Sequence, residues 1–151
     1  MTGIEDRNQP VFVRARALVP HMAQGNGRGE FHLSSSSREA ELTQTYARLG
    51  TRRWPLVLGF PWQHEEELEY RLPAGFRLLR APTARRVECA FGSFDLKVNV
   101  SSDGRAIKVL SLLSVERDRI APSDYESFRA FLREADILLS EPIVIAGENT
   151  L

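Results

Sequence analysis

The single cysteine of the chain, Cys89, is the one thiol that could act as a nucleophile. A cysteine-dependent hydrolase or acyltransferase needs a histidine base within hydrogen-bond reach of the thiol and a third group that orients the base. Cys89 alternates in phase with Val87 and Phe91 on the apolar side of a strand-like run. A free cysteine on such a face behaves as a small hydrophobic residue. We therefore expect Cys89 to pack in the core, and we expect no catalytic residue in this chain.

His64 is followed by three glutamates, Glu65 to Glu67, which superficially suggests a metal-binding helix. The HExxH motif needs a second histidine four residues after the first, so that both imidazoles face one ion, and position 68 is a leucine. His21 and His32 are scattered, and there is no second cysteine. The sequence therefore predicts no metal site.

Neither the glycine-rich run nor the serine run of the chain has the surroundings that catalysis or phosphate binding needs. Residues 25–29 lack the Lys-Ser/Thr pair that meets phosphate and Mg²⁺ in a P-loop. Residues 34–37 lack the Gly-x-Ser-x-Gly elbow of serine hydrolases. We expect turns at both places and no cofactor.

Three aromatic side chains, Trp54, Phe60 and Trp62, flank Pro55 and Pro61. Tryptophan combines a broad apolar face with a polar tip, and such rings form platforms that hold sugars, peptides or partner proteins. Ordinary packing at a sheet corner is the alternative. Trp54, Phe60 and Trp62 are the candidate interaction surface of the chain.

Alternation of apolar and polar side chains predicts a series of short strands bounded by turn residues. The predicted strands lie at 11–19, 31–33, 54–60, 67–72, 76–79, 87–91, 94–101, 106–115 and 143–146. We expect the strand at 54–60 at a sheet edge or next to a bulge, because proline cannot donate to a ladder. Asp103-Gly104 predicts a tight hairpin turn. The run 106–115 is apolar on both sides, so we expect it to be covered on both faces.

Residues 123–139 carry apolar side chains at helical spacing, which predicts an amphipathic helix. Ser123 and Glu126 fit a capping box at its start. The polar segment 38–51 has weak helical spacing and predicts a surface loop with at most one helical turn.

These elements predict a mostly β fold: an antiparallel β-sandwich, Ig-like or Greek-key, of about 7–9 strands, with one C-terminal helix at about 123–139 and a final short strand. A chain of 151 residues suits one domain. We expect that domain at 10–146, a flexible or disordered N-terminus at 1–9, and a flexible tail at 147–151.

Charge and hydropathy exclude several kinds of partner. Twenty basic and twenty acidic residues cancel, so no global field attracts nucleic acid, and we expect none as a partner. No run approaches the ~20 apolar residues of a membrane span. The N-terminus lacks the basic and then apolar pattern of a signal peptide, and the compartment stays open.

A series of short motifs resembles a known family. The motifs are Arg53-Trp54-Pro55-Leu56 ahead of Pro61, Leu72-Pro73-Ala74-Gly75-Phe76, Phe91-Gly92-Ser93-Phe94, and Ile120-Ala121-Pro122-x-Asp124-Tyr125-x-x-Phe128-Arg129. Over residues 10–145 the chain resembles the C-terminal β-sandwich domain of bacterial transglutaminase-like proteins, a domain of unknown function. The resemblance implies an accessory domain that follows a transglutaminase-like catalytic domain, in proteins often exported to the cell envelope. The catalytic cysteine, histidine and aspartate of that family belong to the upstream domain, so Cys89 inherits no role.

Three hypotheses of function follow from these observations. The leading one is a non-catalytic accessory domain that binds the upstream transglutaminase-like domain or another protein. The alternative is a stand-alone module that binds a cell-envelope glycan or peptide through Trp54, Phe60 and Trp62. A cysteine-dependent hydrolase or acyltransferase is the least favoured.

Overall fold

A computed structural model describes residues 23–25, 29–36 and 41–147 of the chain. Within them lie ten strands and two helices. The strands are β1 (Gln24–Gly25), β2 (Glu30–Leu33), β3 (Leu56–Val57), β4 (Trp62–Arg71), β5 (Phe76–Arg80), β6 (Arg85–Cys89), β7 (Gly92–Val100), β8 (Ala106–Val115), β9 (Arg119–Ile120) and β10 (Ile143–Gly147). The helices are α1 (Leu42–Ala47) and α2 (Tyr125–Ser140). The predicted strand at 11–19, the predicted N-terminal segment 1–9 and residues 148–151 of the predicted tail lie outside the described residues.

The longest strands form one antiparallel sheet with the order β4-β8-β7-β6. The predicted hairpin between β7 and β8 is confirmed, with Val100 opposite Ile107 and Gly104 at a φ of 68° in the turn. Glycine is the natural residue at such a positive φ. Three of the strands are consecutive, and β4 lies beside β8 at the other side, which is the strand order of a Greek key.

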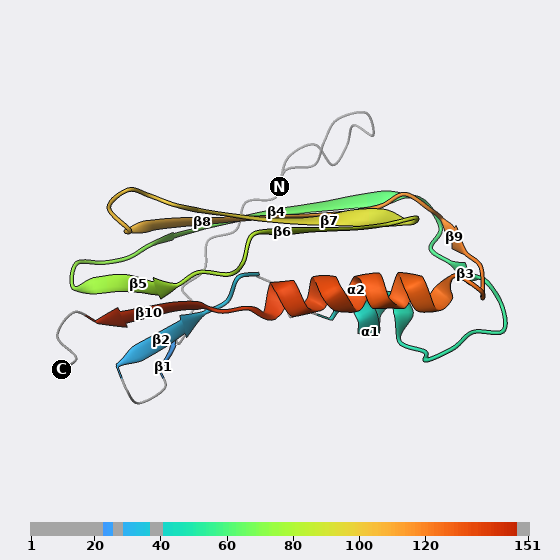
Figure 1. Ribbon diagram of the computed structural model, residues 1–151, viewed down its shortest axis with the longest axis horizontal. Coiled ribbons are helices and arrows are strands. Elements are labelled where there is room, and N and C mark those ends of the chain that lie inside the picture. Colours follow the sequence, from blue (N-terminus) through green and yellow to red (C-terminus); the bar gives the residue numbers. More distant parts are fainter. Residues whose placement is uncertain (1–22, 26–28, 37–40, 148–151) are drawn as a thin grey trace, which may run out of the picture.

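A second layer covers one face of this sheet, and it is built from two kinds of element (Figure 1). The helices α1 and α2 lie under one half. A smaller antiparallel sheet, with the order β1-β2-β10-β5, lies under the other half. The prediction of a mostly β sandwich with one C-terminal helix and a final strand is confirmed.

The core lies between the two layers and follows the predicted periodicities. Strand β8 alternates buried and half-buried residues along its whole length, and β7 buries Phe94 and Leu96. Helix α2 buries a stripe that includes Phe128, Leu132 and Ala135, each at helical spacing from the next. No helix among the described residues is long and apolar enough to cross a membrane.

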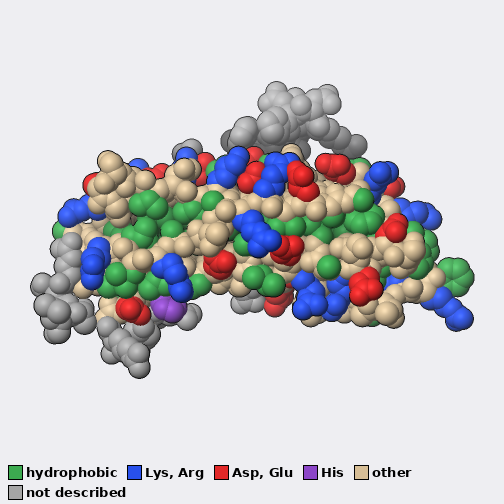
Figure 2. Space-filling view, in the orientation of Figure 1, with side chains coloured by type: hydrophobic (Ala, Val, Ile, Leu, Met, Phe, Trp, Pro, Cys, Tyr) green, Lys and Arg blue, Asp and Glu red, His purple; other side chains and the backbone are tan. Residues whose placement is uncertain are grey.

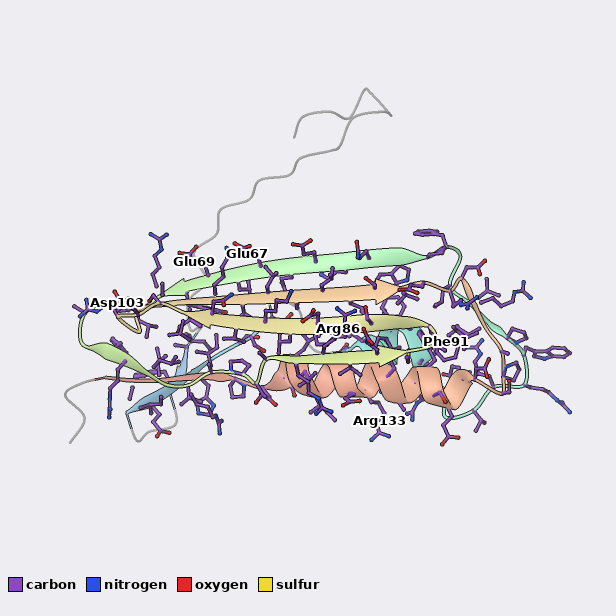
Figure 3. The ribbon with its side chains drawn as sticks, turned by 45° about the horizontal axis from the view of Figure 1, so that its top comes forward. Glu67, Glu69, Arg86, Phe91, Asp103 and Arg133 are labelled. Carbon is purple, nitrogen blue, oxygen red and sulfur yellow. The ribbon has the colours of Figure 1, made fainter. Side chains whose placement is uncertain are left out.

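The cover predicted for the second face of β8 is not found among the described residues. In the described part of the chain no helix or strand packs on that face, and Leu110 and Leu112 are half-buried. In the sheet register charged residues flank these leucines, and their aliphatic stems shield the apolar side chains. Charged side chains on this face form ion pairs such as Lys108 with Glu67 at 2.7 Å, and Glu67 and Glu69 point away from the second layer (Figure 3).

Two local predictions were wrong. The predicted strand at 54–60 shrinks to β3, because Pro55 and Pro61 lack the N–H of a ladder and Gly59 turns the chain with a φ of 90°. The capping box at Ser123 does not form, because Asp124 occupies the N-cap position and makes no side-chain cap hydrogen bond. Glu126 still lies in the first turn, where a negative charge stabilises the helix.

Side chains of α2 hold the short helix α1 at both ends. The Asp136 carboxylate accepts hydrogen bonds from the N–H groups of Leu42 at 2.7 Å and Thr43 at 2.9 Å. Nε of Arg129 donates to the carbonyl of Ala47 at 3.2 Å, beside the last turn. A negative group at the N-terminus and a positive group at the C-terminus both complement the helix dipole. A six-residue helix is marginal alone, so these contacts explain why a polar loop becomes helical.

We predict that Asp136→Ala lowers the free energy of unfolding by about 1–2 kcal/mol, because it leaves two helix N–H groups without their acceptor. Amide hydrogen exchange should accelerate in Leu42–Ala47 more than in β7 or β8. Chemical denaturation measures the first effect. Asp118→Ala, at an exposed aspartate without an ion pair in the described residues, is the control. Equal midpoints for the two variants would show that Asp136 does not hold α1.

Candidate functional site

One end of the molecule exposes large apolar side chains. Trp54 is 75% exposed, Phe60 is 68% exposed and Val57 is 59% exposed. They lie in the segment that carries β3, at the end of the molecule opposite to β5, β10 and β2 (Figure 1). We call Trp54, Val57 and Phe60 the end surface. A cluster of apolar side chains at this exposure is typical of a binding surface.

The third aromatic residue of the candidate surface points elsewhere. Trp62 opens β4 and is half-buried, and its ring lies against Tyr46 of α1 with the centroids 4.9 Å apart. In the register of the long sheet Trp62 is opposite Val115, a core residue. The structure therefore separates the predicted trio: Trp54 and Phe60 are exposed, whereas Trp62 packs between the layers.

Short backbone contacts fix the end surface in place. Strand β3 pairs with β9, with Val57 opposite Arg119 and Leu56 opposite Ile120. The N–H of Leu58 donates to the carbonyl of Asp118 at 2.7 Å. Leu56 and Ile120 are buried, so the segment is anchored from below while Val57 points outward.

A hollow of about 410 Å³ adjoins the end surface. Its lining includes Arg117, Arg119 and Asp124 as charged groups and Phe91, Pro55 and Ala121 as apolar ones. Both arginines are exposed and make no ion pair with any described residue. The Phe91 ring is edge-on to Phe128 of α2 at a centroid distance of 5.9 Å, which fixes the apolar wall.

Cys89 is half-buried against the core at the end of β6. The N–H of Phe91 donates to its sulfur at 3.4 Å. His64 lies on β4, three strands away in the order β4-β8-β7-β6, which corresponds to about 14 Å at the usual strand spacing. His32 lies on β2 in the other sheet. Neither histidine of the described residues forms a pair with this thiol.

A smaller cavity of about 140 Å³ lies between β4, β8 and the helices. Its polar groups include Ser36, His64 and Glu66, and Ser36 Oγ donates to Glu66 at 2.8 Å. A serine nucleophile needs its hydrogen bond with the imidazole, and the described residues contain no such bond between Ser36 and His64. Burial, and secondly the charge of Glu66, raise the pKa of Tyr70, whose hydroxyl donates to the Ser34 carbonyl at 2.7 Å. The geometry is that of a structural polar cluster.

The His64 and glutamate run forms no metal site in the part of the chain that the structure describes. It lies on β4, where successive side chains point to opposite faces. Glu65 and Glu67 therefore face outward, while His64 and Glu66 face inward. The period of a strand divides residues that a helix would have brought together.

Sequence reasoning missed Val57, Arg117 and Arg119 as parts of this region. Val57 lay within a predicted strand, where one face is expected to be buried. The alternation of Arg117 and Arg119 about Asp118 was visible in the sequence. Its proximity to Val57 depends on the pairing of β3 with β9, which no local pattern predicted.

Comparison with family models matches residues 31–145 to a family described as "Domain of Unknown Function with solved-structure structure (DUF3858)". Among solved structures, the crystal structure of a "putative protease" from Parabacteroides distasonis ATCC 8503 is similar, with a TM-score of 0.54 and 15% sequence identity. The similar region covers 65% of this chain and 19% of that chain. At this identity the likeness shows a shared fold alone. A search of curated proteins finds no match.

We predict that Trp54→Ala changes the free energy of unfolding by less than about 0.5 kcal/mol, because the ring contributes little buried area. Trp62→Ala should cost about 2 kcal/mol or more, because it leaves a void against Tyr46. Urea denaturation of both variants checks this contrast. A large loss of stability in Trp54→Ala would mean that this ring serves the core and leave the end surface without its main side chain.

Proposed function

We propose that this chain, which belongs to the DUF3858 family, a domain of unknown function, is a non-catalytic accessory domain that docks on a partner protein through the end surface. The proposed partner is a transglutaminase-like catalytic domain that precedes it in the same polypeptide. This choice rests on the resemblance of the sequence motifs to the C-terminal domain of such proteins.

The observation that carries the proposal is the exposure of Trp54, Val57 and Phe60 at one anchored end of the molecule. Burying a side chain such as Phe60 stabilises an assembly by about 1.5–3 kcal/mol relative to leaving it in water. Aromatic residues are enriched where binding energy concentrates in interfaces. Figure 2 shows apolar side chains at this same end of the molecule, on the right in the view.

The size of the matched region in the structural neighbour also supports an accessory role. The matched 65% of this chain covers 19% of that protein, so most of the neighbour's length lies outside the similar region. A domain of this fold in a longer chain has a neighbouring surface to contact, and such interfaces are commonly 600–1,500 Å².

The separation of the candidate catalytic groups supports the non-catalytic part of the proposal. Cys89 and His64 are separated by about 14 Å across the sheet, and His64 also lies two residues further along β4 than Trp62, which is level with Cys89. Ser36 bonds directly to the carboxylate of Glu66 at 2.8 Å. Neither arrangement gives a nucleophile with an oriented base.

We predict that Cys89 reacts with an aromatic disulfide more slowly in the folded protein than after denaturation, because its thiol packs against the core. Cys89→Ser should leave partner binding within about twofold of the wild type. Absorbance of the released thiolate follows the first measurement. A burst of reaction in the folded protein would contradict the proposal and point to a cysteine-dependent activity.

We predict that this domain binds the transglutaminase-like domain when the two are mixed as separate proteins, and that Trp54→Ala with Phe60→Ala weakens binding by about tenfold or more. Isothermal titration calorimetry measures the dissociation constants. Ile137→Ala is the matched control, because Ile137 is 60% exposed on α2, away from the end surface.

The outcomes distinguish the hypotheses of function. Absence of binding between the two wild-type domains would refute the proposed partner. Equal weakening by Ile137→Ala would refute the end surface as the contact. The glycan-binding alternative would be established by a different result. The wild-type domain would bind a glycan array but not the catalytic domain, and the Trp54 and Phe60 variants would lose binding to the array.

A further inference from the structure

We propose that the hollow beside the end surface receives an acidic segment of the docked partner, with partner carboxylates bound by Arg117 and Arg119. This inference rests on the proposed function and names the chemistry of the partner surface.

The two arginines are placed to act together. Arg117 lies two residues before Arg119, the first residue of β9, and both line the hollow, whereas Asp118 between them does not. Guanidinium groups present planar pairs of N–H donors that match a carboxylate. Neither guanidinium group forms an ion pair or a side-chain hydrogen bond with a described residue.

Some other arginines on the surface are engaged by the protein itself, whereas Arg117 and Arg119 share their lack of an ion pair in the described residues with others such as Arg77 and Arg80 of β5. Arg71, Arg85 and Arg86 each form an ion pair with a glutamate, at distances of 2.5–2.7 Å. Arg52 donates to the Trp54 carbonyl and lies over the Tyr125 ring, 5.5 Å from its centroid. Arg117 and Arg119 thus keep their donors available at a place where the chain also exposes apolar side chains.

The hollow itself favours a negative occupant. Its charged lining consists of two arginines and one aspartate, Asp124, which leaves one positive charge in excess. Asp124 lies at the N-terminus of α2, where the positive end of the helix dipole offsets part of its charge. A partner carboxylate is therefore more favourable here than a partner amine.

The apolar wall of the hollow explains why the occupant is a protein segment and not a free ion. Phe91 forms this wall, and its carbonyl accepts a hydrogen bond from the Glu116 N–H at 2.8 Å (Figure 3). Pro55 continues the wall to Trp54, and Arg119 lies opposite Val57 in the β3–β9 pair. A segment with carboxylates beside an apolar side chain would contact the arginines, Phe91 and the end surface together. Desolvation by this wall strengthens the charged contacts.

The test is a charge reversal with a matched control at the other end of the molecule. Arg117→Glu with Arg119→Glu should weaken binding to the transglutaminase-like domain by about tenfold or more, and most strongly at low salt. The control, Arg77→Glu with Arg80→Glu, makes the same change of charge at two exposed arginines of β5 and should stay within about threefold of the wild type. Calorimetry at about 50 mM and about 300 mM NaCl measures both.

The result separates this inference from the proposed function. If the Trp54 and Phe60 variants lose binding while the reversal at Arg117 and Arg119 equals its control, docking stands and the acidic segment is refuted. If both reversals weaken binding equally, the effect is one of net charge, and the hollow has no specific role.

A second measurement tests the hollow even if the catalytic domain does not bind. The capped peptide acetyl-Glu-Leu-Glu-amide is titrated into the isotopically labelled chain, with acetyl-Lys-Leu-Lys-amide as the control. The acidic peptide should shift the Nε resonances of Arg117 and Arg119 and the amide of Phe91, and the basic peptide should not. Equal shifts with both peptides, or none with either, would overturn the inference.

Discussion

The apolar inner face of the long sheet has to be covered along its whole length, and the rest of the structure follows from that requirement. Strand β8 has ten residues and spans about 33 Å, whereas the sixteen residues of α2 span about 24 Å. One helix is therefore too short to cover the sheet. The chain leaves α2 directly into β10, which carries the cover onward as the centre of the small sheet. A helix and a sheet share one layer because neither alone has the required length.

This arrangement also determines which polar contacts are needed inside the second layer. Helix α2 lies nearer to β6, where Arg85 meets Glu134 at 2.6 Å, so the β4 side needs a second element. Helix α1 fills that place and contacts Trp62 through Tyr46. Its six residues are stable only because Asp136 and Arg129 complement its two ends. The contact of Tyr46 with Trp62 and the hydrogen bonds of Asp136 and Arg129 therefore act together to hold α1 over the β4 side of the sheet.

Local patterns predicted those elements whose period is long and clean. The β7–β8 hairpin follows from strict alternation and Asp103-Gly104, and α2 follows from its apolar stripe. The failures share a physical cause, because each depends on contacts between segments far apart in sequence. Helix α1 needs Asp136, which lies 94 residues after Leu42, and β3 needs β9. The same holds for the candidate site. The sequence identified Trp54 and Phe60, which are exposed, but it could not predict that Trp62 packs inward against Tyr46 of α1.

The end surface and the small cavity compete as explanations of what this fold does, and their construction favours the former. In the cavity Glu66 accepts a hydrogen bond from the Ser36 hydroxyl, and outside its lining Tyr70 donates to the Ser34 carbonyl, so these polar groups join segments of the fold. At the end surface the buried residues Leu56 and Ile120 anchor the backbone, whereas Trp54, Val57 and Phe60 are exposed. A fixed backbone that presents exposed aromatic residues beside available arginines loses little conformational entropy on binding. Exposed aromatic side chains keep apolar area in water in the isolated domain, and a complex would bury that area. For this reason we propose that the function of this domain lies at this end.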